Sequence, residues 1–382
     1  MRICCRKRIK SIETLNKRRV IITAPSLDPA QNVSGVSSVV QFIINHNNRE
    51  CEYEHFQIGK TDRESGGPWQ RLTRTWRKYR EWRRLTAPLA SPPQGETNKA
   101  IVHYSFPLSA PSIMRDPWFM HYALKQGVKM VVHVHGGLFL TAPRIPYVLE
   151  RMLKWVFSWD VPFIVLSEGE KDILMKRFGA KRVEVLPNCP EIPSKSPLKD
   201  GFLSKDLTIG YLGRIEPNKG MTELLCAMGR LKADGKRVKV RFAGKEQTKG
   251  EYIPKYENAL GEDFEYCGLV SDESKKEFLC SLDVFVMPTY FEGLPMSLLE
   301  TMSYGAVPVV TKVGSIPTVV REGENGLFVE KKDVDSIVEA IRRLDDDRTL
   351  LAHLSEEARK TIMEKFSAEK YVERLNEIYC SL

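Results

Sequence analysis

The stretch from Val284 to Glu300, VFVMPTYFEGLPMSLLE, limits the fold more than any other part of the chain. Residues Val284 to Met287 form an apolar run with the length of a buried strand, and Pro288 ends it. Pro295 suits the first turn of a helix, where a missing N–H group costs little. A helix start presents free backbone N–H groups and a positive dipole end, which favour a bound phosphate. The stretch therefore predicts a strand, a loop and a helix, with the loop as a candidate ligand site.

Two carboxylates lie on this predicted turn. Glu292 is in the loop and Glu300 is inside the helix, with seven residues between them. One carboxylate can therefore face a ligand from the loop while the other reaches it from the helix. Carboxylate acceptors at two points suit a ligand with several hydroxyl groups. On spacing alone, two solvated glutamates are the simpler interpretation, and the flanking motifs decide between the two.

Strands alternate with helices in both halves of the chain, which implies parallel sheets with helices on both faces. A proline-rich segment from 187 to 197 separates the halves, and 382 residues are comfortable for two domains. The predicted strands lie at 19–23, 101–105, 129–134 and 162–167 in the first half and at 207–213, 238–244 and 284–287 in the second.

Composition excludes several classes of protein. No run approaches the roughly 18 apolar residues of a membrane span. The N-terminus is basic but has no apolar core, so we expect no secretory signal. The eight cysteines form no C-x-x-C pair and no zinc-type cluster with histidine, which favours reduced thiols in the cytosol.

The setting of the two glutamates, FEGLPMSLLETMSYGAVPVV, resembles the E-x7-E motif of retaining nucleotide-sugar glycosyltransferases of family 4. The segments VGSIPTVVREGENGLFV and YLGRIEPNKG continue the resemblance, which is close in the second half and loose in the first. It implies the α/β GT-B fold, in which two Rossmann-like parallel-sheet domains face each other across a cleft and a C-terminal helix crosses back. The expected parts are a basic disordered lead-in (1–18), an acceptor-binding domain (19–192), a nucleotide-sugar-binding domain (193–365) and the crossover helix (366–382).

Two cations lie across another strand-to-helix turn. Arg214 follows the strand at 207–213, and Lys219 lies five residues further on at a helix start. They can bracket one pyrophosphate, the arginine as a fork and the lysine as a point charge. We find no D-x-D motif in a plausible loop, since residues 345–347 follow a late helix and are expected on the surface. The two cations are therefore predicted to stabilise the leaving diphosphate without a divalent metal or another cofactor.

A histidine at the end of the strand at 129–134 is the candidate on the acceptor side. His135 precedes two glycines, which leave room for close approach of a sugar, and it resembles the H-G position of the family. His133 lies within the strand and is expected in the core. The expected catalytic residues are Glu292, Arg214, Lys219 and His135. The expected donor-binding residues are Gly35, Arg214, Lys219, Lys245, Val270, Glu292, Gly293, Leu294, Pro295, Met296 and Glu300, of which Glu292 would hold sugar hydroxyls and Glu300 the ribose.

The segment RLTRTWRKYREWRRL at 71–85 combines six arginines with an apolar and aromatic stripe at helical spacing. Such a helix suits peripheral contact with an anionic membrane, with its aromatic rings at the headgroup level. The alternative is a stripe that packs on the core of its own domain. Nucleic-acid binding is disfavoured because no nucleic-acid module accompanies the basic residues.

Together these features predict a retaining, metal-independent glycosyltransferase at the cytoplasmic face of the membrane. It would move a sugar from a nucleoside-diphosphate donor to a glycan or lipid-linked acceptor in cell-surface polysaccharide or lipopolysaccharide synthesis. A nucleotide-sugar epimerase of the same fold is one alternative, although it needs acid and base residues on both faces of the sugar. A non-catalytic nucleotide-sugar-binding module is the other.

Overall fold

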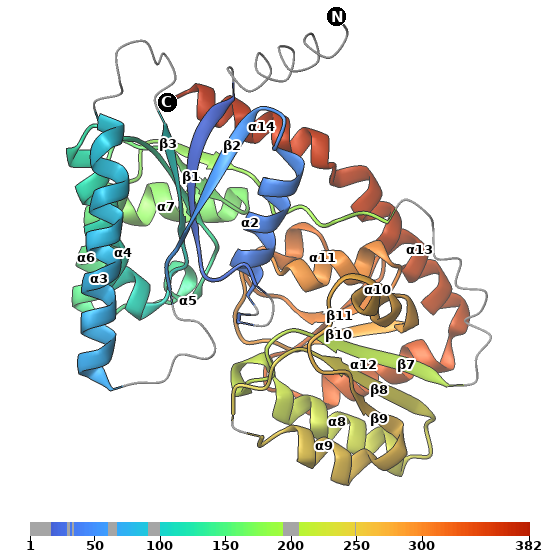
Figure 1. The fold of residues 1–382 in the computed structure, drawn as a ribbon. Helices are drawn as coiled ribbons and strands as arrows, with labels where there is room; N and C mark the ends of the chain where they lie inside the picture. The colour runs from blue at the N-terminus through green and yellow to red at the C-terminus, as the bar shows by residue number, and fades with distance from the viewer. Residues whose placement is uncertain are drawn as a thin grey trace, which may run out of the picture.

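The computed structural model describes residues 17–28, 31–32, 34–59, 67–90, 100–193, 206–248 and 250–382. The predicted lead-in up to residue 16 and the linker residues 194–205 lie outside these ranges. The described chain forms two domains, each built on a six-stranded parallel sheet between helices (Figure 1). The alternation predicted from the sequence is therefore present in both halves.

The first sheet has the strand order β2-β1-β3-β4-β5-β6. Its strands are β1 (Arg18–Ala24), β2 (Cys51–Gln57), β3 (Ile101–Phe106), β4 (Lys129–Val134), β5 (Phe163–Val165) and β6 (Val183–Val185). Its helices are α2 (Gly35–His46), α3 (Pro68–Thr86), α4 (Ala110–Lys125), α5 (Leu138–Thr141), α6 (Tyr147–Phe157) and α7 (Glu168–Phe178).

The second sheet has the order β12-β11-β10-β7-β8-β9. Its strands are β7 (Leu207–Leu212), β8 (Val238–Ala243), β9 (Phe264–Tyr266), β10 (Val284–Met287), β11 (Val307–Thr311) and β12 (Leu327–Val329). The helices of this half are α8 (Met221–Ala233), α9 (Ile253–Leu260), α10 (Asp272–Ser281), α11 (Met296–Ser303), α12 (Val334–Asp346), α13 (Arg348–Lys365) and α14 (Ala368–Cys380).

Alternate residues of β1 enter different cores, as the two-residue period of a strand requires. Ile21 packs with Trp82 of α3 and Phe119 of α4 on one face of the sheet. Val20 and Ile22 face the other way and join a buried cluster that continues through the second domain. One face of the first sheet therefore shares its apolar core with the second domain.

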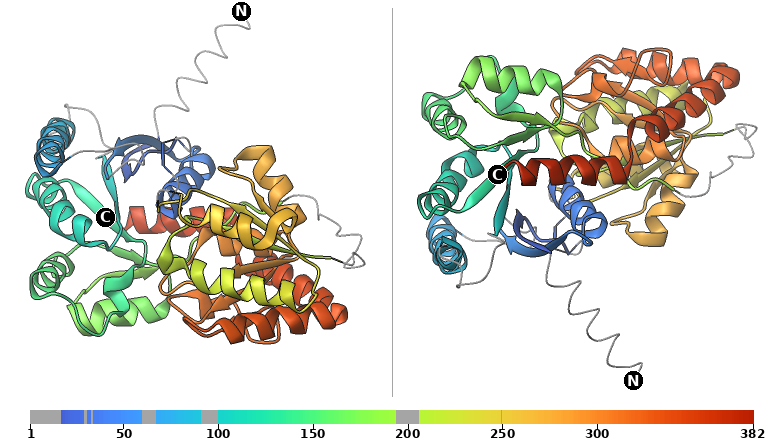
Figure 2. Two further views of the ribbon diagram at one scale, coloured as in Figure 1. Left: turned by 90° about the horizontal axis from the view of Figure 1, so that it is seen from below. Right: turned by 90° about the horizontal axis from the view of Figure 1, so that it is seen from above.

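The last helix, α14, returns to the first domain and lies along it (Figure 2). Its Asn376 exchanges hydrogen bonds with Asn47, and its Arg374 pairs with Glu184 at 2.7 Å. The predicted crossover helix is present, and it ends on the first sheet rather than on the domain that precedes it.

The carboxyl ends of the strands of both sheets face each other. Gly136 follows β4, and a β-carbon added to it would lie 2.5 Å from Cα of Gly293, which follows β10. Ser167 follows β5, and its hydroxyl lies 2.9 Å from that of Ser315, which follows β11. Ligands of parallel α/β sheets bind beyond these ends, so the junction of the two domains is the place to look for a site.

Candidate functional site

The loop between β10 and α11 is held from three sides. Within its own domain, the Tyr290 N–H donates to the Asn218 carbonyl at 2.9 Å and the Ser315 N–H donates to the Gly293 carbonyl at 3.0 Å. From the linker between the domains, the Asn188 amide donates to the Leu294 carbonyl at 2.7 Å. The loop is thus fixed in position by Asn218 and Ser315, which lie in the segments that continue the resemblance, and by Asn188, which lies in the linker.

Pro295 differs slightly from its predicted place. It is the N-cap of α11, with φ −66° and ψ 129°, and the helix begins at Met296. No side chain caps this helix start within the described structure, so its N–H groups are available to a ligand. The predicted helix start therefore lies one residue further along the chain. Leu294 and Met296 are buried beside it and support the loop through packing.

Lys219 and Glu292 form an ion pair at the centre of the site. Their side chains are only 11% and 17% exposed. Gly220, at φ +74°, lets the turn that carries Lys219 press against Pro288, since a side chain there would collide with the proline carbonyl. The two turns predicted separately from the sequence therefore bring a cation and a carboxylate together at one point.

Arg214 is near this pair but not part of it. Its guanidinium lies 3.7 Å from Glu216, and about half of its side chain is exposed. The Tyr211 hydroxyl donates to the Arg214 carbonyl at 2.6 Å, and the Lys245 carbonyl accepts from Ile215 N–H at 2.9 Å. Arg214 and Lys245 thus follow adjacent strands at the same edge of the sheet, where a flexible arginine can reach a diphosphate.

Glu300 lies inside α11 and is nearly buried. It accepts from the Lys275 ammonium of α10 at 2.8 Å, a partner that no sequence motif indicated. Val270 precedes α10 and is partly buried, so both predicted nucleoside contacts lie along one side of the second sheet. Gly35 is the exposed first residue of α2, a helix that contacts α11 across the domain junction.

His135 contributes an imidazole from the first domain. Burial lowers the pKa of His135 to about 3, so its ring is neutral. Neither ring nitrogen has a hydrogen-bond partner among the described residues, although both are buried. The ring stacks on His133, with 4.1 Å between centroids and 26° between planes. A neutral imidazole with open nitrogens can donate or accept one hydrogen bond with a hydroxyl group.

Several buried polar atoms without partners gather at the same junction. Besides the two nitrogens of His135, they are Nε2 of His133 and the side-chain oxygens of Asn188 and Asn218, judged within the described ranges. Buried polar atoms are almost always hydrogen-bonded in native proteins, so such a cluster indicates a place where a ligand supplies the bonds. Asn218 lies in the segment YLGRIEPNKG but was not singled out there, Asn188 has no distinctive motif around it, and their burial without a partner for the side-chain oxygen reveals both.

Glu170 joins the two domains beside this cluster. Its carboxylate accepts from Leu166 N–H at 2.9 Å and from the Ser315 hydroxyl at 3.2 Å. Burial raises the pKa of the Glu170 carboxyl above its usual value. The contact holds the loop after β11 against the loop after β5.

Comparison with known proteins supports the sequence interpretation. Residues 195–361 match the family model described as glycosyl transferases group 1. The second domain of this chain is therefore similar to the glycosyl transferases of group 1. It is 32% identical over 189 residues to a capsular polysaccharide biosynthesis glycosyltransferase of Staphylococcus aureus, covering 47% of each chain. It is 25% identical over 285 residues to the UDP-Gal:alpha-D-GlcNAc-diphosphoundecaprenol alpha-1,3-galactosyltransferase of Escherichia coli, covering 67% of this chain and 70% of that one.

The fold of this chain also matches solved structures. A sucrose-phosphate synthase from Thermosynechococcus elongatus superposes with a TM-score of 0.73 over 96% of this chain and 99% of that one, at 16% identity. The predicted GT-B arrangement is therefore confirmed. The match to the S. aureus relative spans only about half of that protein's length.

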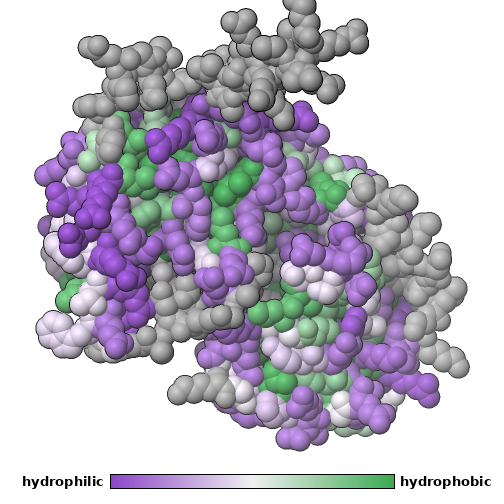
Figure 3. Space-filling view, in the orientation of Figure 1, coloured by the Kyte–Doolittle hydropathy of each residue, from purple (hydrophilic) through white to green (hydrophobic). Residues whose placement is uncertain are grey.

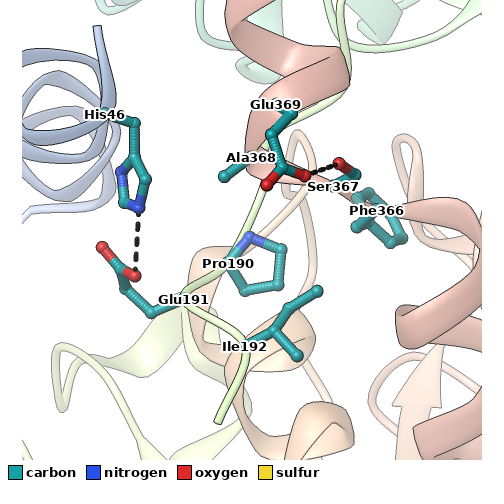
Figure 4. Close-up of a pocket in the computed structure, with 8 residues that line it drawn as sticks. All are labelled: His46, Pro190, Glu191, Ile192, Phe366, Ser367, Ala368 and Glu369. Atoms are coloured by element: carbon teal, nitrogen blue, oxygen red, sulfur yellow. Dashed lines mark hydrogen bonds and ion pairs between the residues drawn. The ribbon is translucent and has the colours of Figure 1, made fainter. Parts of the chain in front are cut away.

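A cavity lies outside this junction. A cavity of about 310 Å³ lies at the hinge, between the end of α2, the linker and the start of α14 (Figure 4). His46 faces Glu191 across it at 3.4 Å. Within the described ranges, no three histidine, cysteine, aspartate or glutamate side chains are grouped as metal ligands would be.

The apolar stripe of the arginine-rich helix α3 is buried in its C-terminal half and exposed in its N-terminal half. Trp82 is fully buried and donates to the Phe119 carbonyl at 2.7 Å, so the C-terminal half packs on the core. Trp69, Leu72 and Trp76 are exposed by 79%, 60% and 61%. The surface over α3 is strongly hydrophilic around them (Figure 3). No helix in the described part of the chain is long and apolar enough to cross a membrane.

Proposed function

We propose that this glycosyltransferase moves a sugar from a nucleoside-diphosphate donor to a glycan or lipid-linked acceptor, with retention of configuration and without a divalent metal. The reaction would serve the synthesis of cell-surface polysaccharide or lipopolysaccharide. The observation that carries the proposal is the largely buried pair of Lys219 and Glu292, placed beside the N-terminus of α11 and the unpartnered His135.

The cations would act on the leaving group. Negative charge develops on the diphosphate as the glycosidic bond breaks, and fixed positive charges stabilise it most when water is excluded. Lys219 is buried and pre-positioned. Arg214, half-exposed at the end of β7, could close over the diphosphate. Free N–H groups at the start of α11 add a positive dipole end. These groups would supply the stabilisation that a metal ion gives in other transferases.

The carboxylates would orient the donor. Glu292 would accept from sugar hydroxyls while it remains paired with Lys219, and Glu300 would accept from the ribose hydroxyls. The sequence offers no convincing nucleophile for the opposite face of the sugar. We therefore favour front-face displacement, in which the leaving phosphate helps to deprotonate the acceptor hydroxyl.

Support for the acceptor class comes from α3. Its exposed Trp69, Leu72 and Trp76 lie among arginines, which suits an anionic membrane surface, where each basic residue contributes roughly 1 kcal/mol. We therefore propose that the enzyme works at the cytoplasmic face of the membrane, where lipid-linked acceptors are presented. The relative from E. coli is named for a diphosphoundecaprenol acceptor, which is consistent with this proposal.

Retention and substrates are tested by one series of assays. A panel of nucleotide sugars is first screened by thermal shift, and the stabilising donor is then incubated with lipid-linked acceptors in the presence of EDTA. Transfer with a retained anomeric configuration, read by proton NMR, is the expected result. An inverted product, or activity that requires added metal, contradicts the proposal. Isomerised donor without acceptor would indicate an epimerase, and binding without turnover would indicate a binding module.

Membrane contact is tested by sedimentation with anionic liposomes at low salt. Trp76→Ser is expected to weaken retention, because it removes an exposed aromatic side chain from α3. The matched control is Met363→Ser, which removes an exposed apolar side chain, 47% accessible, from α13 of the other domain. Equal retention of the two variants and the wild type contradicts membrane contact through α3.

A further inference from the structure

A row of buried side chains connects the crossover helix α14 to His135. The Tyr379 hydroxyl lies 2.7 Å from Nδ1 of His103, and Nε2 of His103 lies 3.1 Å from Nδ1 of His133. The His133 ring then stacks on His135. Tyr379 is 2% exposed, and both His103 and His133 are fully buried.

The sheet itself aligns these imidazoles. In the pairing of β3 with β4, His103 lies opposite Val131 and Ser105 lies opposite His133, so the two histidines are on neighbouring strands at diagonal positions. The contacts of His103 with Tyr379 of α14 and with His133 put both imidazoles on the face of the sheet that α14 covers. Figure 2 shows α14 lying along the first domain. His135 follows His133 by two residues and therefore lies on the same side of the chain.

The protons of the row are coupled. Burial lowers the pKa of His103 to about 3 and that of His133 well below its usual value, so both rings are neutral. A neutral imidazole has one donor and one acceptor nitrogen. Each of the two contacts holds one proton, so the tautomers of His103 and His133 are linked: if the Tyr379 hydroxyl donates to Nδ1 of His103, then Nε2 of His103 donates to Nδ1 of His133. Nε2 of His133 and the nitrogens of His135 remain without a partner within the described structure.

We propose that Tyr379, His103 and His133 are positioning residues that fix the ring of His135 for its contact with a hydroxyl group of the sugar. His133 provides a flat, oriented surface against which the His135 ring is held. The C-terminal helix thereby contributes to the site although it does not touch a substrate. This inference rests on the proposed function, because the ligand of His135 is taken to be the transferred sugar or its acceptor.

A pair of tyrosine variants on α14 tests the proposal. Tyr379→Phe keeps the aromatic ring but removes the hydroxyl that contacts His103. The matched control is Tyr371→Phe, because Tyr371 is 4% exposed on the same helix and its hydroxyl has no partner in the described ranges. Tyr379→Phe is expected to lower kcat about tenfold, the rate equivalent of one hydrogen bond, with the donor KM unchanged. Tyr371→Phe is expected to turn over like the wild type.

The 15N chemical shifts of the histidine rings report their tautomers. These shifts would not change if Tyr379 had a purely structural role. In protein labelled with 15N-histidine, Tyr379→Phe is expected to change the tautomer shifts of His103 and His133, and Tyr371→Phe to leave them unchanged. Equal kcat for the two variants overturns the proposal. If the wild type shows no transfer at all, the proposed function fails and the spectra alone test the positioning residues. Unchanged tautomers in Tyr379→Phe then contradict the coupling of Tyr379, His103 and His133, and changed tautomers support it.

Discussion

Gly136→Ala tests whether the contact between the two domains is needed for catalysis. The added β-carbon would lie 2.5 Å from Cα of Gly293, whereas carbon atoms in contact rest about 3.5–4.0 Å apart. The two loops would therefore have to separate by about 1 Å. His135 and the Lys219–Glu292 pair lie on opposite sides of this contact, and a misplacement of about 1 Å costs on the order of 10²-fold in rate. We expect kcat/KM for the donor to fall by that factor.

Gly136 is at φ +71°, so alanine there is also strained within its own domain. Left-handed backbone costs a residue with a side chain about 1–2 kcal/mol, or a fall in Tm of about 2–8 °C in a domain of this size. Gly127→Ala is the matched control, because Gly127 has φ +74° and no described atom would lie within 4 Å of its added carbon.

Both variants are expected to lose similar thermal stability in differential scanning fluorimetry. Initial rates over a range of donor concentrations should then separate them, with Gly127→Ala close to the wild type. If Gly136→Ala retains the kcat/KM of Gly127→Ala, close approach of the two glycine loops is not required for the reaction and the reasoning is wrong.

Three further predictions concern charge and protonation. Arg214→Ala should lower kcat by on the order of 10²-fold, because its cation acts as charge develops on the diphosphate, and unchanged steady-state turnover removes Arg214 from the mechanism. Glu300→Ala should raise the donor KM more than it lowers kcat, and an equal loss in both argues against a ribose contact. His103 and His135 have pKa values of about 3 in the folded chain. The unfolded chain therefore binds more protons below about pH 6.5, and stability should fall by about 1.4 kcal/mol per pH unit for each histidine on acidification toward pH 4. Denaturant unfolding at several pH values measures this slope, and a flat profile contradicts the burial of neutral rings.

The sequence predicted the parts of the fold that have strong local patterns. The run at Val284–Met287 is an apolar strand with a proline directly after it, and it is β10. Strand β2, CEYEHFQ, was not predicted, because four of its seven residues are polar or charged, as in a surface segment. It becomes a strand through its parallel pairing with β1 along seven positions. Pairing with β1 therefore determines this strand, which the local sequence pattern does not indicate.

The charged residues of the candidate site were predicted, but the residues that pair with them or hold their loops were not. Glu292 and Lys219 were found from motifs on separate turns, and their ion pair depends on packing 73 residues apart in the chain. Asn188 and Lys275 lie in segments without a motif, and their contacts with Leu294 and Glu300 arise only in the folded chain. His133 was expected in the core, where it lies, but its bond to His103 depends on the register of two strands.

The shared apolar core of β1 and the second domain has a consequence for how the molecule unfolds. Val20 and Ile22 lose part of their burial if the second half is removed, and so does Tyr379 of α14 if the chain is shortened at its end. A polypeptide cut between the domains would expose this apolar surface to water, and we expect it to aggregate or to unfold at a lower temperature. The two halves are therefore expected to denature in a single cooperative step, and the enzyme cannot be dissected into independently stable lobes.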